Sequence, residues 1–199
     1  MKEIIGYAAV VLTFVGYLPY VRDTLNGKTR PHVYSWFLWG FITSVAYALQ
    51  VSVHAGPGSL VTIAAAVVCL IIALLGVKNG RKDITKSDTV FFIVGMAAIG
   101  VWLLAKQPII SVVLLSLIDM LAFMPTIRKS WNKPFSETLI TYELNTFRFA
   151  LALFALNNYG IVATLYPATW ILANGLFSAL LIIRRRQLSQ YTVQANKLN

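Results

Sequence analysis

The chain has 199 residues, of which 58% are hydrophobic and only 12% carry a charge. Because soluble domains contain about 25% charged residues, this composition excludes an ordinary soluble protein and predicts an integral membrane protein with several crossings. A net charge of +10 would indicate nucleic acid in a soluble protein, but here the charges fall between apolar segments and predict membrane orientation, with no nucleic-acid partner.

Seven apolar segments are predicted, in chain order, to cross the membrane as helices. Each is close to the roughly 20 residues that span about 30 Å of hydrocarbon. Their apolar runs are continuous and not alternating, which favours helices over barrel strands. The segments are Ile4–Val21, Val33–Val53, Ser59–Val77, Asp88–Ala105, Pro108–Ile127, Thr138–Leu156 and Ile161–Ile183.

The basic residues between these segments predict which end of each helix is cytoplasmic. With seven crossings, the connections after the first, third and fifth segments fall on one side with the tail, and they carry most of the Lys and Arg. The other side offers only Lys2 and Lys106. The positive-inside rule therefore places the N-terminus outside and the C-terminus in the cytoplasm, in a cell inner or plasma membrane. Arg184–Arg186 either flank the last crossing or contact anionic membrane lipid.

An internal repeat divides the chain. PYVRDTLN at residues 19–26 matches PTIRKSWN at residues 125–132, with Pro, Arg and Asn at identical spacing. One helix stands between the copies, so both enter the membrane in the same direction. The predicted fold is all-α, with two parallel three-helix repeats joined by a linker helix (3+1+3). The predicted parts are a first repeat 1–80, a linker helix 81–107, a second repeat 108–186 and a polar cytoplasmic tail 187–199.

The repeated motif resembles the PQ-loop superfamily. Each copy has a proline, a basic connection with lysine, and then a hydroxyl and an aromatic residue four apart, Ser35 with Trp39 and Thr138 with Tyr142. The 3+1+3 order resembles the SWEET (MtN3/saliva-type) sugar-transporter branch. The glutamine that gives the motif its name is replaced by Tyr20 and Thr126 in the two copies.

This resemblance implies a carrier that moves a small polar solute, of the sugar class, by alternating access. Asn174 is similar to the seventh-helix asparagine of the SWEET sugar site, whereas its counterpart in the third helix is an alanine, Ala64 or Ala65. One alternative is a proton-coupled exporter of amino acids or other charged metabolites, similar to cystinosin. Another is a receptor that does not transport, similar to the KDEL receptor.

The sequence offers no nucleophile with a base, no metal-ligand cluster and no phosphate loop, so we expect neither an enzyme nor a cofactor. The single cysteine, Cys69, is expected to be a small buried side chain. With both repeats in one chain, a functional monomer is as compatible with the sequence as a homo-oligomer.

Two prolines are predicted to kink their helices at matching positions. Pro19 and Pro125 each remove one helical hydrogen bond and clash with the carbonyl four residues earlier. The functional interpretation is a hinge about which one repeat rocks against the other. The structural interpretation is a static kink that shapes the bundle.

The sixth segment carries an unusual polar stripe. At 100° per residue, one face carries Thr138, Thr141, Tyr142, Asn145 and Arg148, and Glu143 points roughly the other way. A polar stripe in a membrane helix normally faces the bundle interior or a wet cavity, so this face is predicted to line the path of the solute.

A central arginine in a membrane needs a partner, and Asp119 is the predicted one. Asp119 and Arg148 differ in depth by roughly 7 Å, and their side chains lean toward each other. Glu143 is the competing partner. The resulting pair either fixes helix packing or forms a charged-solute or proton site.

Three further residues are predicted to lie along the path. Trp39 in the second segment corresponds to Tyr142 in the sixth, and either stacks on a sugar face or serves as ordinary aromatic packing. Trp170 and Asn174 share a face of the seventh segment. Asn174 binds either a solute hydroxyl or a neighbouring helix.

Overall fold

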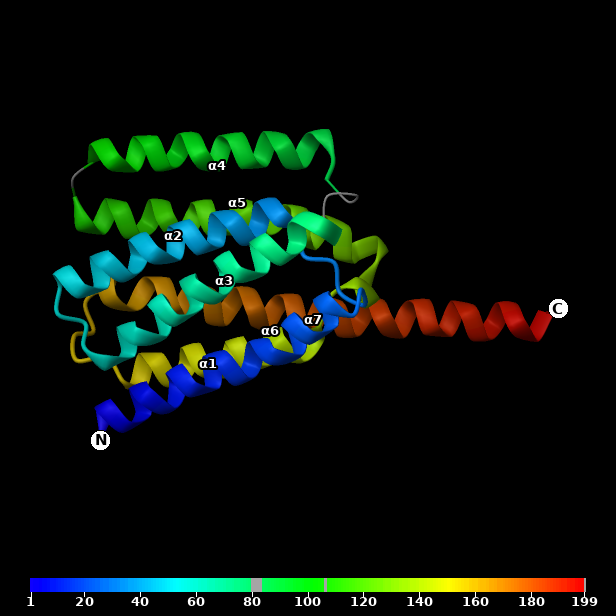
Figure 1. Ribbon diagram of the computed structural model, residues 1–199, viewed down its shortest axis with the longest axis horizontal. Helices are drawn as coiled ribbons and strands as arrows, with labels where there is room; N and C mark the ends of the chain where they lie inside the picture. Colours follow the sequence, from blue (N-terminus) through cyan, green and yellow to red (C-terminus); the bar gives the residue numbers. More distant parts are fainter. Residues whose placement is uncertain (80–83, 106, 199) are drawn as a thin grey trace.

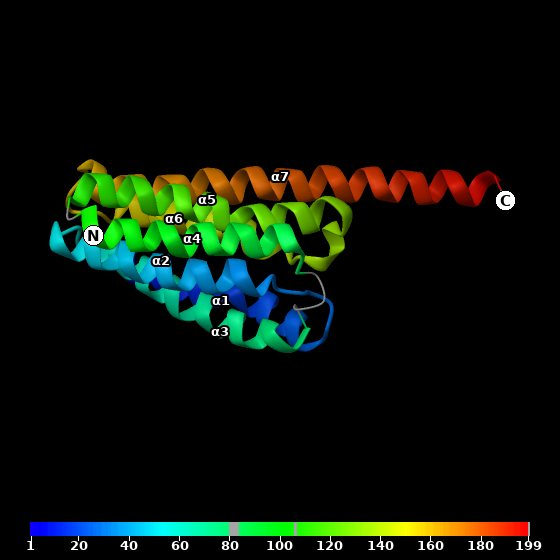
Figure 2. The same ribbon diagram turned by 90° about the horizontal axis from the view of Figure 1, so that it is seen from above.

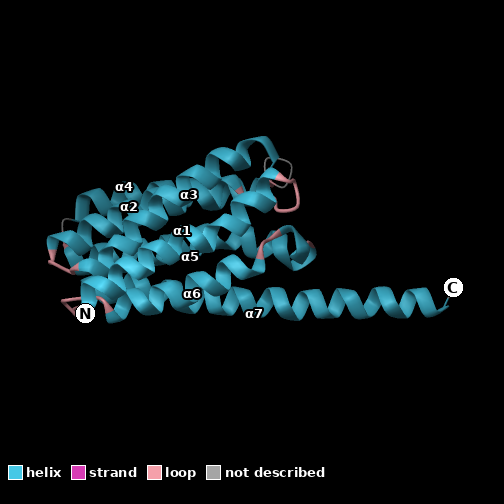
Figure 3. Cartoon of the chain, turned by 60° about the horizontal axis from the view of Figure 1, so that its bottom comes forward, coloured by secondary structure: helices cyan, strands magenta, loops and turns pink. Residues whose placement is uncertain are grey.

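The structure is a computed structural model that describes residues 1–79, 84–105 and 107–198. The chain is 86% helical and no strand occurs in the described ranges, so the prediction of an all-α chain is confirmed (Figure 3). Short 3-10 turns, Pro57–Ser59 and Pro134–Ser136, precede the third and sixth helices. The α-helices of the described residues are α1 (Lys2–Leu25), α2 (Val33–Ser52), α3 (Leu60–Asn79), α4 (Lys86–Ala105), α5 (Pro108–Asn132), α6 (Leu139–Phe154) and α7 (Ile161–Leu198).

Four helical stretches in the described part of the chain are long and apolar enough to cross a membrane. This agrees with an integral membrane protein, whereas the number of crossings stays a prediction. α6 has only 16 residues, several of them polar. The four stretches are Lys2–Leu25, Pro57–Val77, Pro108–Asn132 and Ile161–Ser189.

α1 and α5 are among the helices that run past the apolar segments that predicted them. α1 continues to Leu25 and α5 to Asn132. The added turns contain basic residues, Arg22 in α1 and Lys129 in α5. Such residues interact favourably with the negative end of the helix dipole. Hydropathy therefore marks the apolar part of each helix, and the backbone continues into a polar last turn.

Successive helices run in alternating directions, so their ends gather at two ends of the bundle (Figure 1). The N-terminus and the α2–α3 and α6–α7 connections lie at one end, which we call the N-terminal end. The α1–α2 and α5–α6 connections lie at the other, which we call the basic end. α7 extends beyond the bundle there as far as Leu198, so the predicted polar tail prolongs this helix (Figures 1 and 2). Lys106 lies outside the described residues.

The helices pack in a pattern that is nearly the same in two halves of the bundle, α1–α3 and α5–α7. α3 packs against α1 and α2, and α7 packs in the same way against α5 and α6. The halves meet where α1 contacts α6 and where α2 contacts α5. α4 lies at the edge of the bundle against α5 and α2 (Figure 1).

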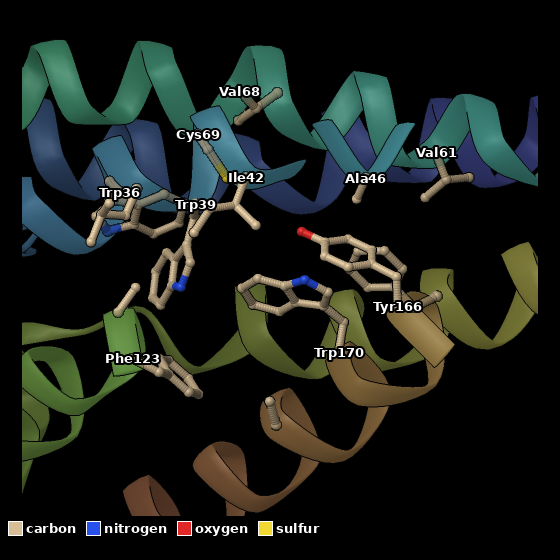
Figure 4. Close-up of a cluster of buried hydrophobic side chains, with 14 of the residues drawn as sticks. Trp36, Trp39, Ile42, Ala46, Val61, Val68, Cys69, Phe123, Tyr166 and Trp170 are labelled. Atoms are coloured by element: carbon tan, nitrogen blue, oxygen red, sulfur yellow. The ribbon is translucent and has the colours of Figure 1, made fainter. Parts of the chain in front are cut away.

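The core is rich in aromatic side chains from both halves. Trp36 and Trp39 of α2, Phe123 of α5, and Tyr166 and Trp170 of α7 converge between the helices (Figure 4). Trp39 is 1% exposed, so it is an interior side chain and not part of a lipid-facing aromatic belt. The ring centroids of Trp39 and Trp170 are 5.5 Å apart in an edge-to-face arrangement, a favourable geometry for aromatic pairs.

Candidate functional site

The polar stripe of α6 is buried against α1 and α7. Thr141, Tyr142, Asn145 and Arg148 are each at most 2% exposed, whereas Glu143 is exposed. The 3.6-residue period of the helix places these four side chains on one face, and the contacts of α6 turn that face toward the other half. A polar face of this kind is stable in an apolar core only if its groups are hydrogen-bonded.

Arg148 is held at the centre of this face by three neutral groups. Its Nε donates to Oδ1 of Asn145 at 2.8 Å, Nη1 to Oγ1 of Thr13 at 3.3 Å, and Nη2 to the hydroxyl of Tyr17 at 3.1 Å. The guanidinium also lies over the ring of Phe149, 4.3 Å from its centroid, and over that of Tyr17 at 5.2 Å. These contacts bring together α1 and α6, one helix from each half.

Asn145 extends the cluster to α7. Its Nδ2 donates to the Tyr17 hydroxyl and to Oδ1 of Asn174, both at 3.3 Å. Asn174 in turn donates from Nδ2 to the backbone carbonyl of Trp170 at 2.8 Å. Asn174 therefore bonds both a neighbouring helix and its own helix, and three predicted path residues, Asn145, Asn174 and Trp170, lie in one connected polar cluster.

Asp119 is buried separately, among indole rings. Its Oδ2 accepts a hydrogen bond from Nε1 of Trp170 at 3.1 Å, and its backbone carbonyl accepts one from Nε1 of Trp39 at 3.4 Å. Oδ1 is buried and has no hydrogen-bond partner among the described residues. The indole of Trp170 lowers the cost of burying this carboxyl group but does not neutralise it.

The predicted ion pair between Asp119 and Arg148 does not form in this structure. Arg148 contacts the ring of Phe149, and Phe149 stacks on Trp170 with centroids 6.0 Å apart and planes 13° apart. Trp170 is the residue that reaches Asp119. The competing partner, Glu143, lies on the exposed side of α6 and forms no salt bridge in the described residues either. The Asp119–Arg148 pair does not form because α5 and α6 pack chiefly against other helices and not against each other. α5 lies against α7, and α6 lies against α1 and α7.

A second buried polar cluster, which we call the Glu137 network, closes the basic end. It consists of Tyr20, Trp36, Lys129, Glu137 and Tyr142. Oε2 of Glu137 accepts hydrogen bonds from the hydroxyls of Tyr20 and Tyr142, both at 2.8 Å, and Oε1 forms an ion pair with Lys129. Nε1 of Trp36 donates to the Tyr20 hydroxyl at 3.1 Å. The network joins α1 and α2 to α5 and α6.

The sequence pattern does not predict the Glu137 network. Lys129 follows the fifth apolar segment, among the basic residues that mark membrane orientation, and Glu137 stands directly before the sixth segment. One signal is present in the repeat: Lys129 occupies the position of Asp23 in the first copy, a reversal of charge within a matched segment. The partners Tyr20 and Glu137 are 117 residues apart, so only the folded chain brings them together.

A pocket of about 420 Å³ opens beside this network. Arg185 of α7 lies in its wall and donates to the backbone carbonyls of Pro134, at 3.1 Å, and Glu137, at 2.5 Å. The wall carries charges of both signs, so the pocket suits a polar ligand rather than an apolar one. Its charged and hydroxyl-bearing residues include Asp23, Lys28, Glu137, Thr138, Glu143 and Arg185.

The N-terminal end is closed by bonds between the α2–α3 and α6–α7 regions. Gln50 donates from Nε2 to the backbone carbonyl of Ala163 at 3.2 Å, and the backbone N–H of Asn157 donates to the carbonyl of Ala55 at 2.8 Å. Ala55, Leu156 and Ala163 form a small apolar cluster there, each with no exposed surface. The polar cluster around Arg148 is thus enclosed between two closed ends.

α4 is fixed to the rest of the basic end by Asp88. Arg128 donates from Nε to Oδ1 of Asp88 at 3.0 Å and from Nη2 to Oδ2 at 2.7 Å. Nε2 of His32, before α2, lies 3.3 Å from Oδ2 but forms no hydrogen bond there. Burial lowers the pKa of His32 below its usual range, and the positive charges of Lys129 and Arg128 add to that effect, against the opposing influence of Asp88.

We therefore expect the protein to become less stable as the pH is lowered, because of His32. Its lowered pKa means that folding favours the neutral ring, so this stabilisation is complete above about pH 6.5 and is lost as the pH falls from there toward the folded pKa. The thermal unfolding midpoint in detergent should fall more steeply below about pH 6.5 for the wild type than for His32→Gln. Parallel curves for the two proteins would show that His32 is not responsible.

Comparisons with protein-family models, with curated proteins and with solved structures found no match to this chain. Among the described residues no group of three or more His, Cys, Asp or Glu side chains is placed to hold a metal ion. Function is therefore inferred from the residues themselves and from how the fold arranges them.

Proposed function

We propose that this chain is a multi-pass membrane carrier of the PQ-loop type, similar to SWEET transporters, that moves a small polar solute by alternating access. The observation that carries the proposal is the matching contact pattern of the two halves, with polar side chains buried where they meet. α1, α2 and α3 pack as α5, α6 and α7 do, and the α1–α6 contact corresponds to α5–α2. This pattern supports the proposed 3+1+3 arrangement, and a central polar site between repeats is typical of carriers.

The proposed orientation has the N-terminus outside and the basic end in the cytoplasm. Arg22, Lys129 and Arg184 lie in helical turns toward the basic end, whereas Lys2 lies in the first turn of α1 at the opposite end. This distribution supports the orientation, because cytoplasmic flanks carry the excess of Lys and Arg. α7 then continues into the cytoplasm.

Alternating access requires that each end opens while the other stays closed. Here both ends are closed by contacts between the halves, which corresponds to the occluded step of such a cycle. The proposed path passes Trp39, Thr141, Tyr142, Asn145, Trp170 and Asn174, all buried between the halves. Pro19 in α1 and Pro125 in α5 interrupt the helices that would have to bend, at the same position in each repeat.

Uptake into proteoliposomes tests this function. The purified chain should accumulate at least one labelled solute from a panel of sugars, polyols, amino acids and organic acids, compared with protein-free vesicles. Pro125→Ala should change the rate while the protein remains folded, because the hinge and not the site is altered. The absence of protein-dependent flux for every solute would refute the carrier and favour a receptor similar to the KDEL receptor.

A second candidate is a proton-coupled exporter of charged metabolites, similar to cystinosin. The observation that favours it is Asp119, a carboxyl group with no exposed surface and no cationic partner in the described part of the chain. Ionisable groups inside a membrane bundle are expensive and commonly belong to proton pathways. A pH gradient should drive flux in this case, and Asp119→Asn should abolish the effect of the gradient. Flux that ignores the gradient would leave only the uncoupled carrier.

A further inference from the structure

Arg148 is the buried cation whose charge the described residues leave unbalanced. It is 1% exposed and forms no salt bridge within the described ranges. The chain treats two other cations differently: Lys129 is paired with Glu137, and Arg128 with Asp88. A buried charge is costly without a counter-charge, and the penalty is greater at the centre of a membrane bundle than at its end.

The groups around Arg148 bond to it without neutralising it. Asn145, Thr13 and Tyr17 supply one neutral oxygen each. The contacts of the two terminal nitrogens, at 3.3 Å and 3.1 Å, are longer than the usual 2.7–2.9 Å of charge-assisted bonds. Both partners of those nitrogens are hydroxyl groups, and the Thr13 hydroxyl donates its own proton to the carbonyl of Ala9 at 2.8 Å. The terminal side of the guanidinium is thus held by two long contacts to neutral groups.

Asp119 does not supply the missing charge. The contacts that connect it to Arg148 pass through two side chains, the ring of Phe149 and the indole of Trp170. Both rings are buried within the aromatic core. The carboxyl group and the guanidinium are therefore separate sites, and a negative charge for Arg148 has to come from outside the described chain.

We propose that Arg148 binds the carboxylate of the transported solute, which makes this chain a carrier for small carboxylate-bearing solutes. This inference rests on the proposed carrier function and names its substrate class. The two terminal nitrogens of a guanidinium match the two oxygens of a carboxylate in a parallel, bidentate arrangement. On binding, the hydroxyls of Thr13 and Tyr17 release the guanidinium, and the Tyr17 hydroxyl can then donate to the solute, whereas the Thr13 hydroxyl keeps its bond to the carbonyl of Ala9. Asn145 keeps its bond to Nε and so fixes the orientation of the guanidinium group.

This assignment also explains why the site lies between the halves. Thr13 and Tyr17 belong to α1, whereas Asn145 and Arg148 belong to α6. A carboxylate that takes the place of the α1 hydroxyls has to part α1 from α6, the contact that joins the two halves. Binding energy at Arg148 is therefore linked directly to the movement that opens the path.

The test compares carboxylates with their own primary amides. Wild-type protein in detergent is heated with glycerate, with alanine and with a series of two- to five-carbon monocarboxylates, each beside its amide, and the unfolding midpoints are compared. Uptake of any stabilising compound is then measured in proteoliposomes. We expect at least one carboxylate to stabilise and be transported, and its amide to do so at least about tenfold less well, because the amide carries no negative charge.

Three variants separate recognition from folding. Arg148→Gln should remove the preference for the carboxylate. Arg148→Lys should retain the preference with weaker binding, because the ammonium group of lysine keeps the charge but cannot form the bidentate contact of a guanidinium. Arg186→Gln is the matched control, since Arg186 is exposed on α7. If Arg148→Gln does not fold, the carboxylate–amide comparison on the wild type decides by itself. Transport of uncharged solutes only, or an unchanged carboxylate preference in Arg148→Gln, would overturn the assignment while leaving the carrier function intact. Absence of all flux would instead refute the carrier.

Discussion

Replacing Lys129 by methionine is expected to lower the free energy of unfolding by about 3–5 kcal/mol, because it leaves a buried carboxylate unpaired. The side chains of Lys129 and Glu137 are 1% and 0% exposed. Nζ of Lys129 also donates to the backbone carbonyl of Arg30, which loses its partner as well. For a chain of this size the loss corresponds to an unfolding midpoint lower by roughly 10 °C, measurable by thermal unfolding in detergent.

The double variant Lys129→Met/Glu137→Gln decides whether the pair is the cause. Removing both charges eliminates the unpaired carboxylate, and the remaining amide can still bond Tyr20 and Tyr142, so much of the stability should return. Lys28→Met is the matched control, since Lys28 is exposed, and it should change stability by no more than about 0.5 kcal/mol. The prediction fails if Lys129→Met behaves like Lys28→Met, or if the losses of the two single variants simply add in the double variant.

The same variant has a consequence for the proposed cycle. Tyr20 and Trp36 come from α1 and α2, whereas Lys129 and Glu137 come from α5 and the turn before α6, so the Glu137 network joins the two halves of the bundle at the basic end. Weakening it should favour conformations that are open at that end.

The helices themselves could be predicted from the sequence because each contains a continuous apolar run. The buried face of α6 could also be predicted, since helical periodicity alone places Thr141, Tyr142, Asn145 and Arg148 on one side and Glu143 on the other. These features depend on residues close together in the chain. The C-terminal ends of α1 and α5 could not be predicted from hydropathy, because their polar last turns lengthen the helix without lengthening the apolar run.

Contacts between helices could not be predicted in the same way. Spacing predicts depth along the membrane, but it does not say which helices are neighbours, and burial of Asp119 and Arg148 in the bundle does not bring them together. α5 and α6 follow each other in the chain, yet each packs chiefly against other helices. The pair was assumed from opposite charge and similar depth, and the rings of Phe149 and Trp170 lie in the way.

Gly58→Ala should be strongly disruptive at the N-terminal end. Gly58 lies in the 3-10 turn before α3, and a Cβ there would come 2.3 Å from the carbonyl oxygen of Ala152 and 2.9 Å from Cδ2 of Leu156. Leu156 can move, but the carbonyl belongs to the backbone of α6, so the helix itself has to shift. Overpacking of this kind costs about 1–3 kcal/mol, and we expect the upper part of that range.

Gly175→Ala is the control for the added methyl group. Gly175 lies within α7, and the nearest atom to its Cβ would be 3.9 Å away, an ordinary contact with Thr146. An alanine in a helix interior is more favourable than glycine by roughly 0.5–1 kcal/mol, so this variant should be at least as stable as the wild type. Equal unfolding midpoints for Gly58→Ala and Gly175→Ala would contradict the close approach at Gly58.

The strain at Gly58 also has a direction. Gly58 precedes α3 and Ala152 belongs to α6, so the added methyl group pushes the two halves of the bundle apart at the N-terminal end while leaving the Glu137 network intact. A penalty of about 3 kcal/mol applied only to the closed form would raise the fraction of molecules open at this end by up to about a hundredfold.

Cysteine labelling tests this opening. Ala163→Cys in a Cys69→Ala background places a thiol in the buried cluster at the N-terminal end. A membrane-impermeant maleimide should label this thiol faster when Gly58→Ala is added, and not when Gly175→Ala is added. Equal labelling rates would mean that the two halves do not separate there, and the alternating-access interpretation of this contact would be wrong.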